Sequence, residues 1–169
     1  MSVDELRQGI AALLPQMRRF ARTLAWQRED ADDLVQVALE RAIKAEAQWQ
    51  PGTRLDAWVY RIMKNAWIDE LRSRGRQREV MVDVDAEELS EKVGQSETGA
   101  VITRLSVNKA MQSLPEDQRL AVSLVLVEGL SYKEAAEALE IPIGTLTSRL
   151  ARGREALQAM LVDGDLSDE

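Results

Sequence analysis

The residues best suited to chemistry in this 169-residue sequence are hydroxyls and arginines that recur at helical spacing near its C-terminal end. They stand at positions i, i+3, i+4 and i+7 and would share one face of a helix: Thr145, Ser148, Arg149 and Arg152. Arginine bonds to guanine edges or to phosphates, while threonine and serine bond to bases or to the DNA backbone. The spacing therefore predicts a helix that enters a major groove, and an ordinary helical hairpin with a solvated basic edge is the alternative.

Two helices joined by a tight turn are predicted to position that face. Ser131 can cap the first helix, and Glu134 can reach back to it in a capping box. Pro142 ends this helix because proline cannot continue its hydrogen bonding. The second helix is predicted to begin near Gly144 or Thr145 and to carry leucines on a separate apolar stripe. The pair has the organisation of a helix–turn–helix.

A second basic surface is predicted on a long helix in the first half of the chain. Apolar residues at helical spacing run from Leu55 to Leu71, and the basic run RSRGRQR follows them. Cations along a helix can follow phosphates, and an asparagine offers both a donor and an acceptor to a base edge. The candidates for DNA contact on this helix and at its exit are Arg61, Lys64, Asn65, Arg72 and Arg76.

The rest of the chain is also predicted to be helical. Asp30 is the expected N-cap of a helix that runs to about Gln48, and Thr53 is the expected N-cap of the long helix after it. The run LAVSLVLV between Pro115 and Gly129 could be a buried strand, but its length and its end signals favour a core helix. The predicted fold class is therefore all-α.

Two small helical domains joined by a flexible acidic linker are the predicted organisation. The predicted parts are an N-terminal domain at 1–78, a linker at 79–100, a helix–turn–helix domain at 101–162 and an acidic tail at 163–169. The linker has room for one short helical turn at 86–93, and the tail is expected to fray.

Composition excludes several classes of protein. The sequence holds no cysteine and no histidine, which excludes disulfides, thiolate or imidazole metal sites and histidine-dependent catalytic triads. No catalytic residue, metal site or cofactor is predicted. No apolar run approaches the length of a membrane span, and Asp4 and Glu5 argue against a signal peptide, so a soluble intracellular protein is expected.

The net charge of −7 does not argue against nucleic-acid binding, because the acids are concentrated outside both predicted domains. Residues 79–100 hold seven acids and one lysine, and residues 163–169 hold four acids. The predicted N-terminal domain carries more basic than acidic residues. The distribution of the charged residues along the chain, rather than the net charge, therefore decides whether nucleic-acid binding is plausible.

Three blocks of the sequence resemble extracytoplasmic-function sigma factors, the small promoter-recognition subunits of bacterial RNA polymerase. DADDLVQVALERAI at 30–43 resembles the helix that binds the polymerase clamp. The block from Arg54 to Arg76 resembles the segment that recognises and melts the minus-ten element, and Ser113 to Leu157 resembles the domain that reads the minus-thirty-five element. The blocks follow the family's order and spacing and span most of the chain.

This resemblance implies roles for particular residues. It implies docking on the coiled coil of the largest polymerase subunit through Asp33, Gln36 and Glu40. It implies that the second helix of the helix–turn–helix faces the minus-thirty-five element with Thr145, Thr147, Ser148, Arg149 and Arg152. The loop at 47–53, with Trp49, resembles the loop that captures a flipped base. Thr147 and Ala151 depart from the usual family pattern, which leaves the preferred minus-thirty-five sequence open.

The resemblance also implies the function and the partners. The chain would bind core RNA polymerase and promoter DNA, direct promoter-specific initiation in the bacterial cytoplasm without bond chemistry or membrane insertion, and respond to stress under the control of an anti-sigma protein. Two alternatives stay open. One is a sigma-like decoy that titrates an anti-sigma protein, and the other is a plain helix–turn–helix regulator.

Overall fold

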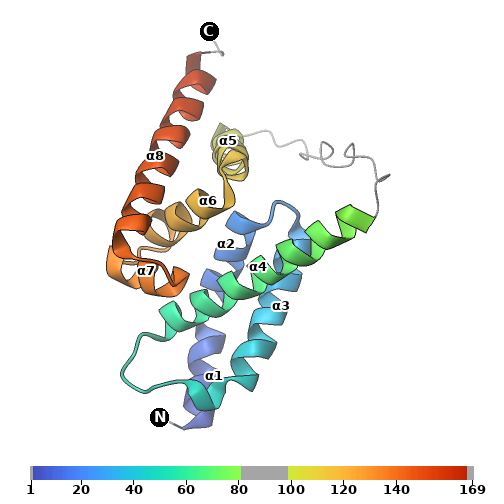
Figure 1. Cartoon of the computed structure of the whole chain (residues 1–169), viewed down its shortest axis with the longest axis vertical. Helices are drawn as coiled ribbons and strands as arrows, with labels where there is room; N and C mark the ends of the chain where they lie inside the picture. The colour runs from blue at the N-terminus through green and yellow to red at the C-terminus, as the bar shows by residue number, and fades with distance from the viewer. Residues whose placement is uncertain (1, 81–98, 167–169) are drawn as a thin grey trace.

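The computed structural model describes residues 2–80 and 99–166, with side chains described within 2–76 and 106–162. Every regular element in these ranges is helical, which confirms the all-α class. Figure 1 shows two helical bundles that lie side by side, with α7 against the N-terminal half of α4. The predicted turn at 86–93 lies outside the described residues, as do residues 1 and 167–169.

Short connections join the helices within each bundle. The N-terminal bundle contains α1 (Val3–Ala12), α2 (Leu14–Leu24), α3 (Arg28–Lys44), the 3-10 turn η1 (Glu46–Gln48) and α4 (Leu55–Val80). The C-terminal bundle contains α5 (Gly99–Ser113), α6 (Glu116–Val122), the π-helical turn η3 (Ser123–Val127), α7 (Tyr132–Leu139) and α8 (Ile143–Leu166). Within the described residues no helix is both long enough and apolar enough to cross a membrane.

Two of the predicted helix starts are wrong. The α3 helix begins at Arg28 after an extended Gln27, so Asp30 lies inside its first turn rather than at its N-cap. Asp30 instead pairs with Arg74 of α4 at 2.7 Å. Thr53 does not cap α4 either, because α4 begins at Leu55 and the carbonyl of Arg54 accepts its first hydrogen bond, while the Thr53 hydroxyl donates to the Gln50 carbonyl at 2.7 Å. In both cases the polar side chain has another partner close by.

The helix–turn–helix unit forms as predicted. Ser131 and Glu134 make both hydrogen bonds of the capping box at the start of α7. That helix ends at Leu139, and its C-cap residue Glu140 has a left-handed φ of 58° that turns the chain toward α8. The α8 helix then begins at Ile143, slightly before the predicted start. The run LAVSLVLV is helical, and its second half is the π-helical turn η3.

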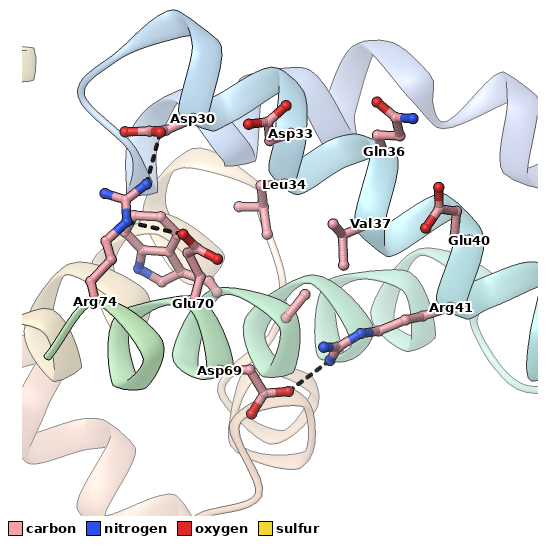
Figure 2. Close-up of a pocket in the computed structure, with 12 residues that line it drawn as sticks. Asp30, Asp33, Leu34, Gln36, Val37, Glu40, Arg41, Asp69, Glu70 and Arg74 are labelled. Atoms are coloured by element: carbon pink, nitrogen blue, oxygen red, sulfur yellow. Dashed lines mark hydrogen bonds and ion pairs between the residues drawn. The ribbon is translucent and has the colours of Figure 1, made fainter. Parts of the chain in front are cut away.

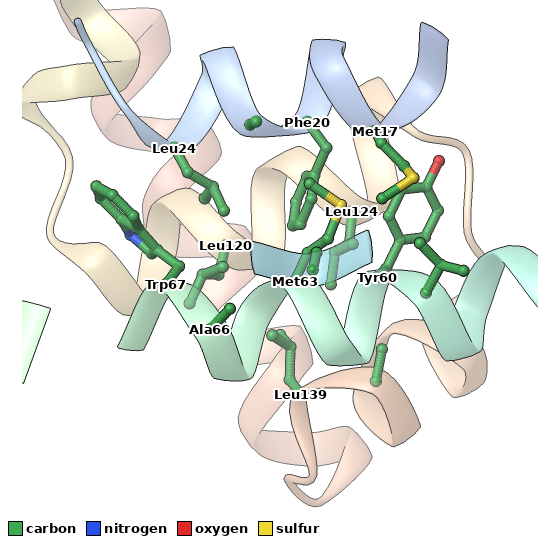
Figure 3. Packing of buried hydrophobic residues seen from close by; sticks show 14 of the residues in the cluster. Met17, Phe20, Leu24, Tyr60, Met63, Ala66, Trp67, Leu120, Leu124 and Leu139 are labelled. Atoms are coloured by element: carbon green, nitrogen blue, oxygen red, sulfur yellow. The ribbon is translucent and has the colours of Figure 1, made fainter. Parts of the chain in front are cut away.

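One apolar core runs through both bundles (Figure 3). Phe20 of α2 is fully buried and meets Tyr60 of α4 edge to face, with ring centroids 5.2 Å apart. From the C-terminal bundle, Leu120 and Leu124 enter the same cluster next to Met63. The two bundles are therefore joined by burial of apolar surface as well as by the chain between them.

Candidate polymerase and nucleic-acid surfaces

The first candidate surface is a groove of about 460 Å³ between α3 and α4 (Figure 2). Leu34 and Val37 point into it from α3, and Val37 stays 38% exposed. Three polar side chains stand along the outer edge of α3 and are exposed to solvent: Asp33, Gln36 and Glu40. The groove thus offers a small apolar floor with a polar, acidic rim.

Ion pairs across this groove account for several of its charges. Arg41 reaches Asp69 of α4 at 2.9 Å, and Arg74 reaches Asp30 at 2.7 Å. Asp33 and Glu40 have no ion pair within the described part of the chain. These two carboxylates are therefore available to a basic or hydrogen-bonding partner without the loss of an internal contact.

The second candidate surface is the face of α4 that was predicted to contact DNA. Arg72 and Arg76 are exposed, and Asn65 is half-buried. Arg61 is exposed but pairs with Glu140 of the C-terminal bundle at 2.9 Å. Lys64 is only 5% exposed, and burial lowers the pKa of its ammonium below the ordinary value. The structure thus leaves the two arginines at the exit of α4 open and covers its middle.

A pocket of about 520 Å³ lies where the loop after η1 meets α4 and α7. Trp49 and Trp58 line it with their rings tilted and their centroids 5.5 Å apart. Trp49 is 9% exposed, and its buried indole N–H has no partner within the described residues. Two aromatic rings beside Arg54 and Arg61 form a surface on which a base could stack.

The third candidate surface is the outer face of α8. Thr147, Ser148 and Arg152 are exposed, and Thr145 is half-buried. Arg149 is half-buried and lies 3.5 Å from Asp117 of α6. The structure therefore brings all five predicted residues onto one helix and leaves three of them open to solvent.

Packing of α8 against α6 fixes the orientation of that face. Leu146 and Leu150 are buried, and Gly153 lies so close to α6 that an added Cβ would stand 2.6 Å from Val122 Cγ2. A side chain at this position would push the two helices apart, so the glycine permits their close approach.

Carboxylate clusters on these surfaces are not arranged for a metal. Among the described residues, no group of three or more acidic side chains could hold a metal ion. The three surfaces offer charge, hydrogen bonds and aromatic rings, which are the means of recognition.

Comparison with known proteins decides the family. Residues 10–77 match the family described as Sigma-70 region 2, and residues 104–157 match Sigma-70, region 4. The ECF RNA polymerase sigma factor EcfG of Rhodopseudomonas palustris is 38% identical over 162 residues, which are 95% of this chain and 88% of that protein. The chain belongs to the extracytoplasmic-function (ECF) family of sigma factors.

Other members of the ECF family support this assignment. The ECF RNA polymerase sigma-E factor of Escherichia coli K12 is 34% identical over 142 residues, which are 76% of this chain and 72% of that protein. The co-crystal structure of the sigma factor RpoE with the anti-sigma factor NepR from Bartonella quintana has a TM-score of 0.81 at 32% identity, over 93% of this chain and 96% of that one. The resemblance predicted from the sequence blocks is confirmed.

The sequence did not predict the contacts that join the two halves of this ECF sigma factor. Glu128 has a side chain with no exposed surface and accepts hydrogen bonds from Arg19 and from the Tyr60 hydroxyl at 2.6 and 2.8 Å. Burial and the bond to Glu128 raise the pKa of Tyr60 above its ordinary value. Helical periodicity identifies a polar or apolar face of a helix but does not identify the residues that the face contacts. No signal in the sequence therefore predicts the contacts of Glu128 with Arg19 and Tyr60.

Proposed function

We propose that this ECF sigma factor binds core RNA polymerase through the groove between α3 and α4. Asp33, Gln36 and Glu40 would form the rim that contacts the coiled coil of the largest subunit, and Val37 would contribute apolar area. The observation that supports this role is that both carboxylates are exposed and have no ion pair among the described residues. A docking surface with free charges engages a partner without breaking internal bonds.

We further propose that α4 recognises and opens the minus-ten element. Arg61, Lys64, Arg72 and Arg76 would follow phosphates, and Asn65 would contact a base edge. The pocket lined by Trp49 and Trp58 would receive an unstacked base, since an aromatic surface accepts any base face. This role requires that the middle of α4 be uncovered first.

The outer face of α8 is proposed to read the minus-thirty-five element. Arg149 and Arg152 would contact guanine edges or phosphates, and the hydroxyls of Thr145, Thr147 and Ser148 would contact bases or backbone. The Thr147 hydroxyl already donates to the Ile143 carbonyl at 2.8 Å, which leaves its oxygen lone pairs as acceptors for a base amine.

The proposed partner that restrains this sigma factor is an anti-sigma protein. Support comes from a relative with a TM-score of 0.81, which was solved in complex with the anti-sigma factor NepR. We also propose that the protein acts in the bacterial cytoplasm, responds to stress and performs no bond chemistry, because promoter selection is a binding function and the polymerase makes the RNA.

Transcription with purified core polymerase tests the proposal. Core enzyme and this protein would be incubated with fragmented genomic DNA of the source bacterium, and the 5′ ends of the transcripts would be mapped. A sigma factor yields transcripts that begin downstream of a shared two-part motif. A decoy yields none, and a plain helix–turn–helix regulator binds the fragments without core polymerase.

Matched variants assign the docking surface. The double variant Asp33→Asn with Glu40→Gln should lower the affinity for core polymerase about tenfold, since two direct contacts of a charged surface are lost. Asp32→Asn is the control, because Asp32 is exposed on the flank of α3 that faces α2. Equal affinities for core polymerase in the double variant and the control would remove the groove from the proposal.

A further inference from the structure

Two arginines on the outer face of α8 differ in how they are held. Arg149 is half-buried, and its Nε lies 3.5 Å from Oδ2 of Asp117 on α6. Arg152 is exposed and has no ion pair or hydrogen bond within the part of the chain that the structure describes. The proposed function gives both arginines the same two possible contacts, a guanine edge or a phosphate. The difference in restraint indicates which contact suits each arginine.

The carboxylate of Asp117 is itself held on its other side. Its Oδ1 accepts a hydrogen bond from the backbone N–H of Gln118 at 2.9 Å, in the first turn of α6. One oxygen is therefore bound to its own helix, and the other faces Arg149. Because this carboxylate cannot turn freely, the ion pair restrains the direction of the guanidinium as well as balancing its charge.

Close packing of α6 against α8 sets the distance between these two side chains (Figure 1). Gly153 follows Arg149 by about one turn of α8. A Cβ added to this glycine would stand 3.4 Å from the Gln118 carbonyl oxygen and 2.6 Å from Val122 Cγ2. The start of α6 thus lies against the stretch of α8 that carries Arg149, which keeps Asp117 within reach of its guanidinium.

An ion pair at Nε leaves the end of the guanidinium open. Arginine has five N–H donors, and four of them are on the two terminal nitrogens. These nitrogens of Arg149 have no partner among the described residues, and 33% of the side-chain surface is exposed. Guanine accepts two parallel bonds from arginine, at O6 and N7, so it needs a guanidinium in one defined orientation. A phosphate contact carries no sequence information and makes no such demand.

We propose that Asp117 is a positioning residue that orients Arg149 for a paired contact with one guanine of the minus-thirty-five element, and that Arg152 contacts a phosphate. The inference rests on the proposed role of α8 and deepens it, because it assigns a different contact to each arginine. It also adds a residue of α6 that acts on base recognition through Arg149. A side chain that is already restrained loses less freedom on binding, so the restraint favours the base contact.

The variant Asp117→Asn tests the positioning. Asparagine keeps a side-chain oxygen for the Gln118 N–H, so the first turn of α6 retains its hydrogen bond. Its amide nitrogen would then face Nε of Arg149, and two donors do not attract each other. The control is Glu137→Gln, which also removes one negative charge from the C-terminal bundle. Glu137 is exposed on α7 and has no partner among the described residues.

The assay is filter binding of holoenzyme, assembled from core polymerase and the full chain, to a promoter found by transcript mapping. Each base pair of the minus-thirty-five element is substituted in turn. The wild type and Glu137→Gln should prefer guanine at one position by about tenfold, and Arg149→Ala should lose that preference. At the same position 7-deazaguanine, which lacks the N7 acceptor, should weaken binding of the wild type but not of Arg149→Ala.

Asp117→Asn should reduce this guanine preference to about twofold or less and leave the affinity for unrelated DNA equal to that of the control. In the Arg149→Ala background, Asp117→Asn should cause no further loss, because the two side chains act as one unit. Arg152→Ala should instead weaken binding to every minus-thirty-five sequence alike and reduce the salt slope by about one.

An unchanged guanine preference in Asp117→Asn would overturn the inference. Tighter binding of Asp117→Asn to every promoter would also overturn it, because Asp117 would then only neutralise Arg149. A loss confined to guanine in Arg152→Ala would refute the division between the two arginines. If circular dichroism shows that Asp117→Asn does not fold, Asp117→Glu replaces it, because it keeps the charge and displaces the carboxylate by one methylene group; an unchanged preference in that variant is then the refuting result.

Transcription separates this inference from the proposed function. Promoter-specific transcripts from the wild-type holoenzyme, together with an unchanged guanine preference in Asp117→Asn, refute only the positioning role. Inactivity of the wild-type protein with core polymerase refutes the proposed function itself.

Discussion

The contact between Gly153 of α8 and Val122 of α6 predicts that Gly153→Ala destabilises the protein, although alanine usually stabilises a helix relative to glycine. An added Cβ would lie 2.6 Å from Val122 Cγ2 and 3.4 Å from the Gln118 carbonyl oxygen. Alanine gains about 1 kcal/mol over glycine inside a helix, whereas overpacking costs about 1–3 kcal/mol. Val122 is 2% exposed and cannot swing into solvent. We therefore expect Gly153→Ala to lower the free energy of unfolding by about 1 kcal/mol.

Removal of the opposing methyl group should reverse the sign. Val122→Ala alone should cost about 2 kcal/mol, because it deletes two buried methyl groups. In that background Cγ2 is absent, so Gly153→Ala should raise the free energy of unfolding by about 1 kcal/mol. The two substitutions should thus be coupled by about 2 kcal/mol, which a double-mutant cycle measures.

Urea unfolding followed by far-ultraviolet circular dichroism is the assay. Gly75→Ala is the control, because a Cβ at this position of α4 would meet nothing within 4 Å. It should stabilise the protein by up to about 1 kcal/mol. The refuting result is an equal destabilisation by Gly153→Ala in the wild-type background and in the Val122→Ala background. Close packing of α8 on α6 would then not be the reason for a glycine at position 153.

Three further predictions concern single elements. The hydrogen bond from Ser131 lowers the pKa of the Glu134 carboxyl below its ordinary value. The ionised carboxylate therefore stabilises the fold fully at pH values above the ordinary pKa, and this stabilisation is lost as the pH falls through the lower pKa of the folded state. The urea midpoints of the wild type and of Glu134→Gln should converge between pH values of about 6 and 3. Gly129 has a φ of 76°, so Gly129→Ala should lower the free energy of unfolding by about 1 kcal/mol in the same urea assay, and an unchanged midpoint would refute the strain argument. Arg152→Ala should weaken binding of the holoenzyme to promoters by about tenfold in filter binding, and a loss that is independent of salt would argue against a phosphate contact.

Local signals in the sequence predicted the helix–turn–helix well. The capping box of Ser131 with Glu134 needs only residues three apart, and the structure contains it. The cap predicted at Asp30 failed because Asp30 has a competing partner, Arg74, and the cap predicted at Thr53 failed because α4 begins at Leu55, one residue too late for Thr53 to precede it directly. Arg74 is distant in sequence, so the residues near Asp30 carry no information about it.

The sequence predicted which face of each helix is polar, but it did not predict what each face contacts in the folded protein. Helical spacing places Arg61 and Lys64 on the polar side of α4, but it cannot predict that Glu140 would pair with one and that burial would hide the other. Such contacts depend on how two bundles pack, and long-range packing leaves no periodic trace in either partner. The polar faces predicted on α3 and α8 stay largely exposed, and the roles of their residues remain predictions.

The bond between Trp67 and Glu116 gives this protein an optical signal of its own. All four tryptophans lie in the N-terminal bundle, and Trp67 is the one whose indole N–H donates to a side chain of α6. Transfer of this buried indole into water would shift its emission to longer wavelength, while Trp26, already 42% exposed, would contribute a constant background. Since DNA does not emit in this range, the difference between the wild-type spectrum and that of Trp67→Phe would record separation of the bundles in real time without a label.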